Sequence, residues 1–379
     1  MANSLSVQPV TTPRQRRDFF SLRRKIYQHD PNVVYPLNSM ERKQLSPTDH
    51  PFYEHASREM FVCYRDQTPV GRIAAIKDTM HNEQHQDQVG FSGFFEAEDD
   101  QAIVDGLIAA AAQWLVDSGC DTMRGPVNPS MKSDFGVVVE GNDDPPCIMM
   151  GYSHKRYEQQ LLDCGFEVAK TFFAYKFLSR ENEDSKPLWA RIEKTQAKIL
   201  KRYPQLSFRS VDEKNYEATF RDINKLGNTV RSHGWGFVPL TENELSFMIK
   251  NLRRVIQFDR IHTAYWDDQL VGYIVSIPDV NWALKRTLGK WDWIRMIQLS
   301  SLIRGARRSR VIALGVDENF RKKGIAMLLI QRIIEQHRAF DEWEFSWVDE
   351  DNVKSIRAIA GAVPLIKSKS YRLYDKPIS

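Results

Sequence analysis

One stretch of sequence decides the fold of the second half of the chain, and it reads Leu314-Gly315-Val316-Asp317-Glu318-Asn319-Phe320-Arg321-Lys322-Lys323-Gly324-Ile325-Ala326-Met327-Leu328-Leu329-Ile330. An apolar run leads into a basic bend, and an apolar helical pattern follows the bend at once. This layout points several backbone N–H groups and the positive end of the helix dipole at one place. Such a place binds phosphate. Arg321, Lys322 and Lys323 add positive charge, while Gly324 and Ala326 keep the backbone accessible.

The segments around this bend alternate between strand and helix patterns, and the same order occurs twice. In the second half, strands are expected at 260–265, 270–277, 309–316 and 343–347, with a helix over 324–337. In the first half, strands are expected at 59–64, 70–76, 89–95 and 122–124, with a helix over 101–118. The repetition predicts an α/β (α+β) fold and either a duplicated domain or a similar order of elements that arose independently. We expect the domains to span 1–180 and 187–379, with the polar stretch 180–186 between them.

Composition excludes several classes of protein. The 379 residues are 42% hydrophobic and 27% charged, as in an ordinary globular protein with room for two domains. A net charge of +4, from 53 basic and 49 acidic side chains, argues against a nucleic-acid partner. The four cysteines form no CxxC pair, so we expect no metal. No segment has a run of about 18 apolar residues, and a cytoplasmic location is expected.

The basic bend resembles the GNAT (Gcn5-related N-acetyltransferase) family, which carries Arg/Gln-x-x-Gly-x-Gly/Ala where its fourth strand meets its third helix. Arg321, Gly324 and Ala326 match this motif, and Asn352 stands where the family has an Asn after its fifth strand. The resemblance covers about 205–379. It implies an N-acyltransferase that uses acyl-CoA, with acetyl as the default acyl group. The cofactor-binding residues that it implies are Leu314, Gly315, Val316, Arg321, Lys322, Lys323, Gly324, Ile325, Ala326 and Asn352.

The same resemblance suggests how the thioester would be activated. The backbone N–H of Val316 would polarise the carbonyl, because the family's strand bulges there. The nearest carboxylates are Asp349 and Glu350, at the end of the fifth strand, either as the base or as solvated turn residues that cap the fourth helix. Asp279 is a second candidate for the base, together with Asn281 for binding the amine.

The general acid is less well defined by the resemblance. Many family members place a tyrosine seven residues after the Asn, but this chain has Ile359 there. Either Tyr371 or Tyr374 replaces it, or the CoA thiolate, with an unperturbed pKa of about 8.5, leaves without a dedicated acid.

The first half lacks the features of a phosphate site. Its equivalent loop, 96–100, has four carboxylates in five residues, no base and no glycine, and would repel a pyrophosphate. Asn128, Ser130 and Asp134 lie among Gly/Pro turns. They either bind the acceptor or are ordinary turn residues without a function of their own. As a whole, the chain resembles an uncharacterised bacterial family of tandem GNAT proteins with a degenerate N-terminal half. This resemblance implies two GNAT-like domains, each a central mixed, mostly antiparallel sheet flanked by helices, with catalysis at a site between the domains.

Two further segments are candidates for contact with the acceptor. His233 and Trp235 lie where the family has an acceptor lid, although an isolated loop histidine is more often only solvated. Residues 282–310 combine several tryptophans with dense Arg and Lys. One interpretation is that they contact a membrane surface or line a channel for an apolar substrate. The other is an inserted helix with a solvated basic face. The acceptor that we expect is a small-molecule or lipid amine.

Three functions remain possible from the sequence. The first is an N-acyltransferase, including one that carries long acyl chains to a lipid amine. The second is a non-catalytic acyl-CoA sensor or scaffold, suggested by the missing helix tyrosine and by a fourth strand without an acid. The third, transfer from aminoacyl-tRNA, is disfavoured because the phosphate bend is intact and the net charge is modest. The oligomeric state does not follow from the sequence.

Overall fold

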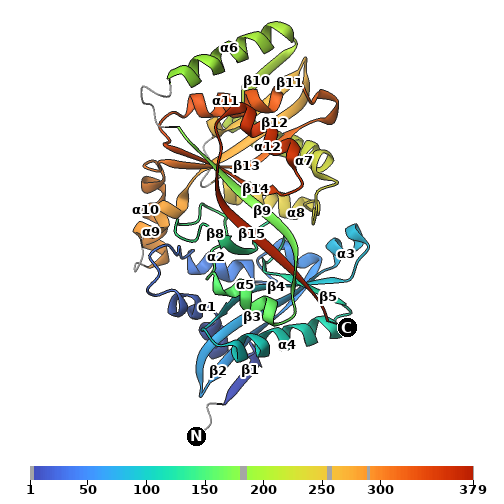
Figure 1. Cartoon of the computed structure of the whole chain (residues 1–379), viewed down its shortest axis with the longest axis vertical. Helices are drawn as coiled ribbons and strands as arrows, with labels where there is room; N and C mark the ends of the chain where they lie inside the picture. The colour runs from blue at the N-terminus through green and yellow to red at the C-terminus, as the bar shows by residue number, and fades with distance from the viewer. Residues whose placement is uncertain (1–3, 180–185, 254–257, 288–290, 379) are drawn as a thin grey trace. The chain divides into compact units, whose positions relative to one another are not determined.

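The structure is a computed structural model that describes residues 4–179, 186–253, 258–287 and 291–378 (Figure 1). It divides into two compact units. The first contains Met1–Thr171, Leu288–Arg295 and Lys369–Ser379, and the second contains Phe172–Thr287 and Met296–Ser368.

The elements of each unit follow in chain order. The first unit has β1 (Leu5–Pro9), α1 (Pro13–Ile26), α2 (Asn38–Gln44), β2 (Ala56–Arg65), β3 (Thr68–Asp78), α3 (Thr79–His85), β4 (Val89–Ala97), α4 (Gln101–Asp117), β5 (Thr122–Gly125), β6 (Val127–Asn128), β7 (Asp134–Phe135), β8 (Val137–Glu140) and α5 (Arg156–Asp163). The second has α6 (Lys186–Arg202), β10 (Leu206–Ser210), α7 (Tyr216–Arg231), α8 (Glu242–Leu252), β11 (Ile261–Trp266), β12 (Gln269–Pro278), α9 (Val280–Arg286), β13 (Arg308–Val316), α11 (Ile325–Gln336), β14 (Glu342–Asp349) and α12 (Val353–Ala362). Three elements have residues in both units: β9 (Glu167–Leu178), α10 (Asp292–Ile303) and β15 (Ile366–Pro377).

The sheet of the first unit follows the order β1-β2-β3-β4-β5 and then β15. Its neighbours are antiparallel except β4 and β5, which are parallel. The Ala-rich helix α4 packs on this sheet through a stripe of fully buried residues with helical spacing. This stripe contains Ile103, Leu107, Ala111 and Leu115.

The sheet of the second unit follows the order β10-β11-β12-β13-β14 and then β9. Again one pair, β13 and β14, is parallel and the others are antiparallel. Helix α11 is apolar on almost every side because both the sheet and α12 cover it; Leu329, Ile330 and Ile333 are fully buried. Burying each such side chain contributes about 1.5–3 kcal/mol. The predicted fold class, two mixed and mostly antiparallel sheets flanked by helices, is confirmed.

Two strands pair outside the domain to which the sequence assigns them. Tyr374 in β15 pairs with Gly125 of the first unit, so the end of the chain completes the first sheet. Phe177 in β9 pairs with Trp343 of the second unit. The compact units therefore differ from the predicted division into 1–180 and 187–379, because strand patterns do not tell which sheet a strand joins. The predicted linker, 180–186, lies almost wholly outside the described residues.

Candidate active site

The central feature of the second unit is the separation of its two parallel strands. β13 and β14 are in register from Arg308–Glu342 to Val311–Phe345, and the pairing ends there although both strands continue. Both strands are irregular at this point. The register of β13 with β12 shifts at Ile312, and that of β14 with β9 shifts between Phe345 and Val348. The strands therefore diverge, and among the described residues the edge of β13 beyond Val311 has no partner strand on the β14 side.

The hydrogen-bond pattern shows which backbone groups lie on this open edge. Asp317 donates its N–H to the carbonyl of Val271 in β12 at 2.9 Å. Because alternate residues of a strand point their backbone groups to opposite sides, Leu314 and Val316 point theirs toward the diverging β14. The register of β13 is regular from Ala313 to Val316, so the prediction of a bulge at Val316 is wrong. The strand bulges at Ile312 instead. The N–H of Val316 nevertheless faces the gap.

Directly after β13, the chain forms the predicted basic bend. A short 3-10 turn, Glu318–Phe320, leads to Lys322 with φ of 65° and Gly324 with φ of 83°. Helix α11 begins at Ile325, and its N-cap residue, Gly324, has no side chain to cap the first turn. N–H groups at such a helix start suit an anion.

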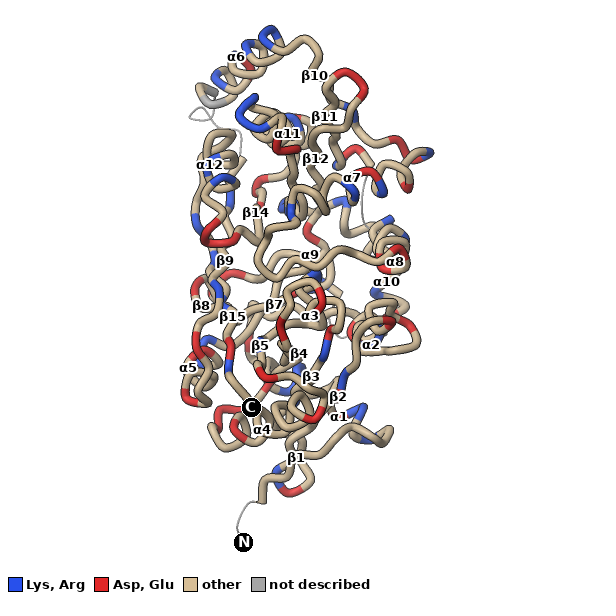
Figure 2. Tube along the Cα trace, turned by 90° about the vertical axis from the view of Figure 1, so that its right-hand side faces the viewer, with Lys and Arg blue, Asp and Glu red and all other residues tan. Residues whose placement is uncertain are grey.

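The charges around the bend suit an anion as well (Figure 2). Lys322 is exposed, and Lys323 has its ammonium 5.5 Å from the ring of Trp266. Arg321 forms an ion pair with Glu318, an exposed carboxylate that an incoming phosphate could replace.

Helix α6 lies against this bend, as Figure 1 also shows. A Cβ atom on Gly324 would stand 2.6 Å from the side chain of Ile199. Gly324 is thus required by its left-handed backbone and by α6. The expectation that it leaves space for a ligand stays a prediction. The contact between Ile199 and Gly324 joins residues that are distant in the sequence, so sequence patterns do not predict it.

A buried polar cluster lies beside the point where the strands part. Trp343 and Phe345 belong to the core below α11, so Glu344 and Ser346 point to the opposite face of the sheet. The Ser346 hydroxyl donates to Glu344 Oε1 at 2.8 Å. Arg310 Nε donates to Ser346 Oγ at 2.9 Å, which fixes the hydroxyl between a cation and a carboxylate.

The electrostatics of Glu344 are those of a candidate base. Its side chain is 2% exposed. Burial raises the pKa of its carboxyl, and the guanidinium groups of Arg310 and Arg308 oppose that rise. A carboxyl with a raised pKa is a stronger proton acceptor than an exposed one. Glu344 is not among the residues predicted from the sequence; the available signal was a charged residue in the middle of the apolar strand 343–347.

Asp279, one of the predicted bases, is engaged at the edge of this cluster. Its carboxylate is 1% exposed, lies 2.7 Å from Arg308 and accepts the N–H of Asn281 at 3.1 Å as the N-cap of α9. Asn281, predicted to bind the amine, is in the first turn of α9. The pair between Asp279 and Arg308 therefore gives this carboxylate a structural role, and its catalytic role stays a prediction.

The structure places the other predicted carboxylates in the turn after β14. Asp349 accepts the N–H of Asp351 at 2.9 Å, and Glu350 is exposed. Asn352 caps α12 by accepting the N–H of Ser355 at 3.0 Å. These contacts define a turn and a helix start, and the proposed roles in catalysis and cofactor binding stay predictions.

The remaining predicted residues of this half are spread over several elements. His233 is exposed in the turn after α7, and the half-buried Trp235 packs its ring 6.0 Å from that of Phe172. Tyr371, predicted as a general acid, is fully buried in β15 and pairs with Val138 of the first unit. Their proposed roles stay predictions.

The first unit has the corresponding elements without the open site. The start of α4 is capped by Asp100, whose carboxylate accepts the N–H of Ala102 at 3.0 Å and lies 2.6 Å from Arg65. Glu98 lies 3.1 Å from the same Arg65. The carboxylates of Asp100 and Glu98, paired with Arg65, thus lie where a phosphate would bind, as expected from the acidic loop.

The gap between β4 and β5 of the first unit is filled by its own chain. Asn128 Oδ1 accepts the N–H of Phe94 at 2.5 Å, and a Cβ on Gly93 would stand 1.9 Å from the carbonyl oxygen of Val127. Asp134 faces Asn128 in the β6–β7 ladder, and burial raises the pKa of its carboxyl. The predicted acceptor residues Asn128 and Asp134 are thus engaged in closing this gap.

The third predicted acceptor residue of the first half, Ser130, is 7% exposed. It accepts the N–H of Lys132 at 3.3 Å. Ser130 thus stabilises a turn, and the acceptor-binding roles of Asn128, Ser130 and Asp134 stay predictions.

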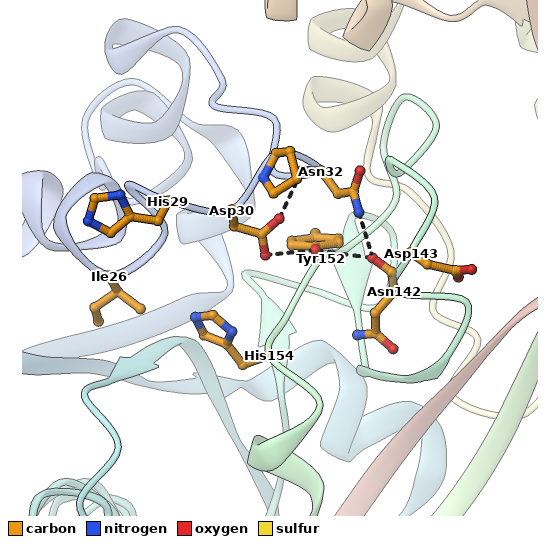
Figure 3. Close-up of a pocket in the computed structure, with 9 residues that line it drawn as sticks. Ile26, His29, Asp30, Asn32, Asn142, Asp143, Tyr152 and His154 are labelled. Atoms are coloured by element: carbon orange, nitrogen blue, oxygen red, sulfur yellow. Dashed lines mark hydrogen bonds between the residues drawn. The ribbon is translucent and has the colours of Figure 1, made fainter.

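The first unit also has an open cavity of about 540 Å³ (Figure 3). Its polar groups bind one another: the Tyr152 hydroxyl donates to Asp30 at 2.8 Å, and Asn32 donates to the carbonyl of Asn142 at 3.2 Å. Burial lowers the pKa of His154 to about 4, so its imidazole is neutral at physiological pH. These contacts hold two loops together, and we assign the cavity no activity.

The described ranges were compared with two kinds of site, a membrane-spanning helix and a metal centre, and contain neither. In that part of the chain, no helix is long and apolar enough to cross a membrane. Within the same ranges, His, Cys, Asp and Glu side chains form no group of three or more that could hold a metal ion.

Comparisons with known proteins agree with this geometry. The family described as "Acetyltransferase (GNAT) family" matches residues 231–360. The chain is 30% identical over 389 residues to the bacterial ceramide synthase of Caulobacter vibrioides (strain NA1000 / CB15N), covering 99% of this chain and 98% of that protein. It is 28% identical over 393 residues to protein YghO of Escherichia coli (strain K12), covering 100% of this chain and 98% of that one.

Among solved structures, a tandem GNAT protein from the clavulanic acid biosynthesis pathway matches with a TM-score of 0.57. The two sequences are 10% identical, and the match covers 99% of each chain. At this identity the likeness concerns the fold alone.

Proposed function

Because the chain belongs to the GNAT family of acyltransferases, in its tandem arrangement, we propose that it is an acyl-CoA-dependent N-acyltransferase that places a long acyl chain on the amino group of a lipid. The observation that carries the proposal is the open edge of β13 leading into an uncapped helix α11. An extended pantetheine arm can add to an unpaired strand edge, and a pyrophosphate suits the helix start.

The donor would lie along one path in the second unit. The N–H groups of Leu314 and Val316 would bind the pantetheine arm and polarise the thioester carbonyl. The N–H groups from Ile325 onward, with Lys322 and Lys323, would bind the phosphates.

Glu344 is our candidate for the general base. In the proposed reaction the amine nitrogen attacks the thioester carbon, and the C–S bond then breaks to release CoA as a thiolate. The amine loses a proton to Ser346 Oγ while the serine proton passes to ionised Glu344. Arg310 holds the serine hydroxyl in this position. No dedicated acid is needed, because a thiol with a pKa of about 8.5 leaves readily.

We favour a long acyl chain over the acetyl group expected from the sequence. The support is the relative named bacterial ceramide synthase, since a ceramide is a long-chain amino alcohol with a fatty acyl group on its nitrogen. The Trp-rich segment 282–310 also suits an apolar substrate.

The test is calorimetric titration with acetyl-CoA and palmitoyl-CoA, using two matched variants. Ala326 and Ala102 are each the second residue of their helices, α11 and α4. Ala326→Glu places a carboxylate at the proposed phosphate site, and Ala102→Glu does the same at a site already capped by acid. We expect Ala326→Glu to weaken palmitoyl-CoA binding at least about tenfold by like-charge repulsion, with Ala102→Glu unchanged.

The transfer step is tested separately by mass spectrometry of long-chain amino alcohols incubated with palmitoyl-CoA and the protein. An N-acyl product supports the transferase. Binding without product for any amine would favour the second candidate, an acyl-CoA sensor. Binding that is equal in both variants and the wild type would remove the proposed phosphate site.

A further inference from the structure

Helix α10 presents an unusual apolar surface. Trp293, Met296 and Ile297 are 64%, 49% and 67% exposed, and Trp291, just before the helix, is 76% exposed. Residues spaced by three and four share one helix face, so these side chains form one patch. We call these four residues the tryptophan patch. Exposing so much apolar surface is unfavourable unless something covers it.

The opposite side of the helix is firmly held, so the patch does not face outward by chance. Arg295 is 1% exposed and donates to the carbonyl of Tyr35 at 2.9 Å and to that of Pro36 at 3.2 Å. Asp292 accepts the N–H of Ser39 at 2.9 Å. These bonds fix the rotation of α10 about its axis.

The charge around the patch is strongly one-sided. Residues 282–310 contain one acidic side chain, Asp292, which is already engaged. The same segment contains eight basic side chains: Lys285, Arg286, Lys290, Arg295, Arg304, Arg307, Arg308 and Arg310. Of these, Arg286, Arg304 and Arg307 are exposed, although Arg307 is paired with Asp341. A segment that combines exposed tryptophans with exposed arginines matches the headgroup region of an anionic bilayer.

The segment that carries α10 starts and ends at the candidate active site. Asp279 donates its N–H to the carbonyl of Arg308 at 2.8 Å, and their side chains form the ion pair beside the polar cluster. Trp282 packs on Gly305, which holds the two arms of the segment together. Residues 288–290 lie outside the described part of the chain.

We propose that the tryptophan patch docks on an anionic lipid bilayer, with its tryptophans among the headgroups and the exposed arginines on the lipid phosphates. This inference rests on the proposed lipid acceptor. Docking brings the membrane to the segment whose ends, Asp279 and Arg308, form the ion pair beside the polar cluster.

The experiment is sedimentation of the full chain with vesicles, in the absence of acyl-CoA. Vesicles of phosphatidylcholine with phosphatidylglycerol are compared with vesicles of phosphatidylcholine alone. The test variant is Trp293→Glu with Ile297→Glu. The matched control is Leu162→Glu with Val168→Glu, two exposed apolar residues elsewhere, with 37% and 46% exposure. A third variant, Arg286→Glu with Arg304→Glu, tests the charge.

We expect the wild type and the control to bind the anionic vesicles. The Trp293→Glu variant should bind at least about tenfold more weakly, because acidic groups oppose insertion of the patch. The arginine variant should lose its preference for anionic vesicles, and salt should weaken the wild type. Brominated lipid should quench the tryptophan fluorescence of the wild type and of the control, in which the patch is intact. It should not quench the fluorescence of the Trp293→Glu variant to the same extent.

Equal vesicle binding by the wild type and the Trp293→Glu variant would overturn the proposal, as would an absence of binding. Sedimentation velocity without vesicles tests whether the patch binds a second copy of the chain. A dimer that forms in the wild type but not in the Trp293→Glu variant would overturn the proposal in favour of that second copy. Failure here leaves acyl transfer to a detergent-dispersed amine unaffected, so it is distinguishable from failure of the proposed function.

Discussion

The substitution Glu344→Gln tests the proposed chemistry most sharply. It keeps the size of the side chain and its capacity to accept a hydrogen bond from Ser346, but it cannot accept the proton. Glu342→Gln is the matched control, because Glu342 lies on the same strand and, by its spacing, on the same face. Its side chain is 21% exposed and 3.7 Å from Arg308.

The expected loss follows from the role of the base. A positioned general base contributes about 10²–10⁴-fold, which is about 2.7–5.5 kcal/mol of transition-state stabilisation. Glu342 takes part only in a partly exposed ion pair, worth about 0–1 kcal/mol, so its variant should stay within about fivefold of the wild type. Burial raises the pKa of Glu344. The wild-type kcat/KM should therefore fall as the pH drops through a value above the ordinary 4.5 of a glutamate.

The assay is kcat/KM for palmitoyl-CoA consumption with a long-chain amino alcohol, from pH 4.5 to 8 in steps of roughly half a unit, chosen to span the titration of a raised carboxyl. Glu344→Gln should lose both the rate and the acidic limb of the profile, with unchanged palmitoyl-CoA affinity. Melting temperatures establish that both variants are folded. An acidic limb that survives in Glu344→Gln, or equal losses in the two variants, would refute the assignment of Glu344 as base.

Three other predictions concern stability and binding. Gly324→Ala forces a left-handed alanine against Ile199, so we expect about 1–2 kcal/mol lower unfolding free energy by urea denaturation and weaker palmitoyl-CoA binding. Asn128→Ala leaves the N–H of Phe94 without its acceptor and should lower the unfolding free energy by about 1–3 kcal/mol, with an unchanged Kd for palmitoyl-CoA. Burial lowers the pKa of His262 from 6.5 to about 4, so the folded protein binds fewer protons than the unfolded chain between these values and loses stability as the pH falls. Between pH 7 and pH 4, the free energy of unfolding should fall by about 3 kcal/mol more in the wild type than in His262→Leu. Urea unfolding at the two pH values measures both falls, and equal falls would contradict the prediction.

The phosphate bend was predictable because its signal is local. A strand, a basic turn with Gly324 and an apolar helix follow one another directly in the sequence, and the structure gives them the expected conformations. The acidic start of α4 was predictable for the same reason: Asp100 immediately precedes the helix that it caps.

The missed features depend on contacts that are distant in the sequence. Glu344 becomes a candidate base only when Arg310 of the neighbouring strand holds Ser346 beside it. The motif around Asn128 was singled out, but its contact with Phe94 spans 34 residues and could not be inferred. The final strand joins the first sheet through Tyr374 and Gly125, a pairing that strand periodicity does not encode.

The central claim is that a donor thioester lies along the free edge of β13 and rests its phosphates on the first turn of α11. Hydrogen–deuterium exchange with and without palmitoyl-CoA measures those backbone amides directly. We predict slower exchange in peptides covering 312–327 and no change in peptides covering 93–104 of the first unit. Unchanged exchange over 312–327 at saturating ligand, or protection over 93–104 instead, would contradict the account.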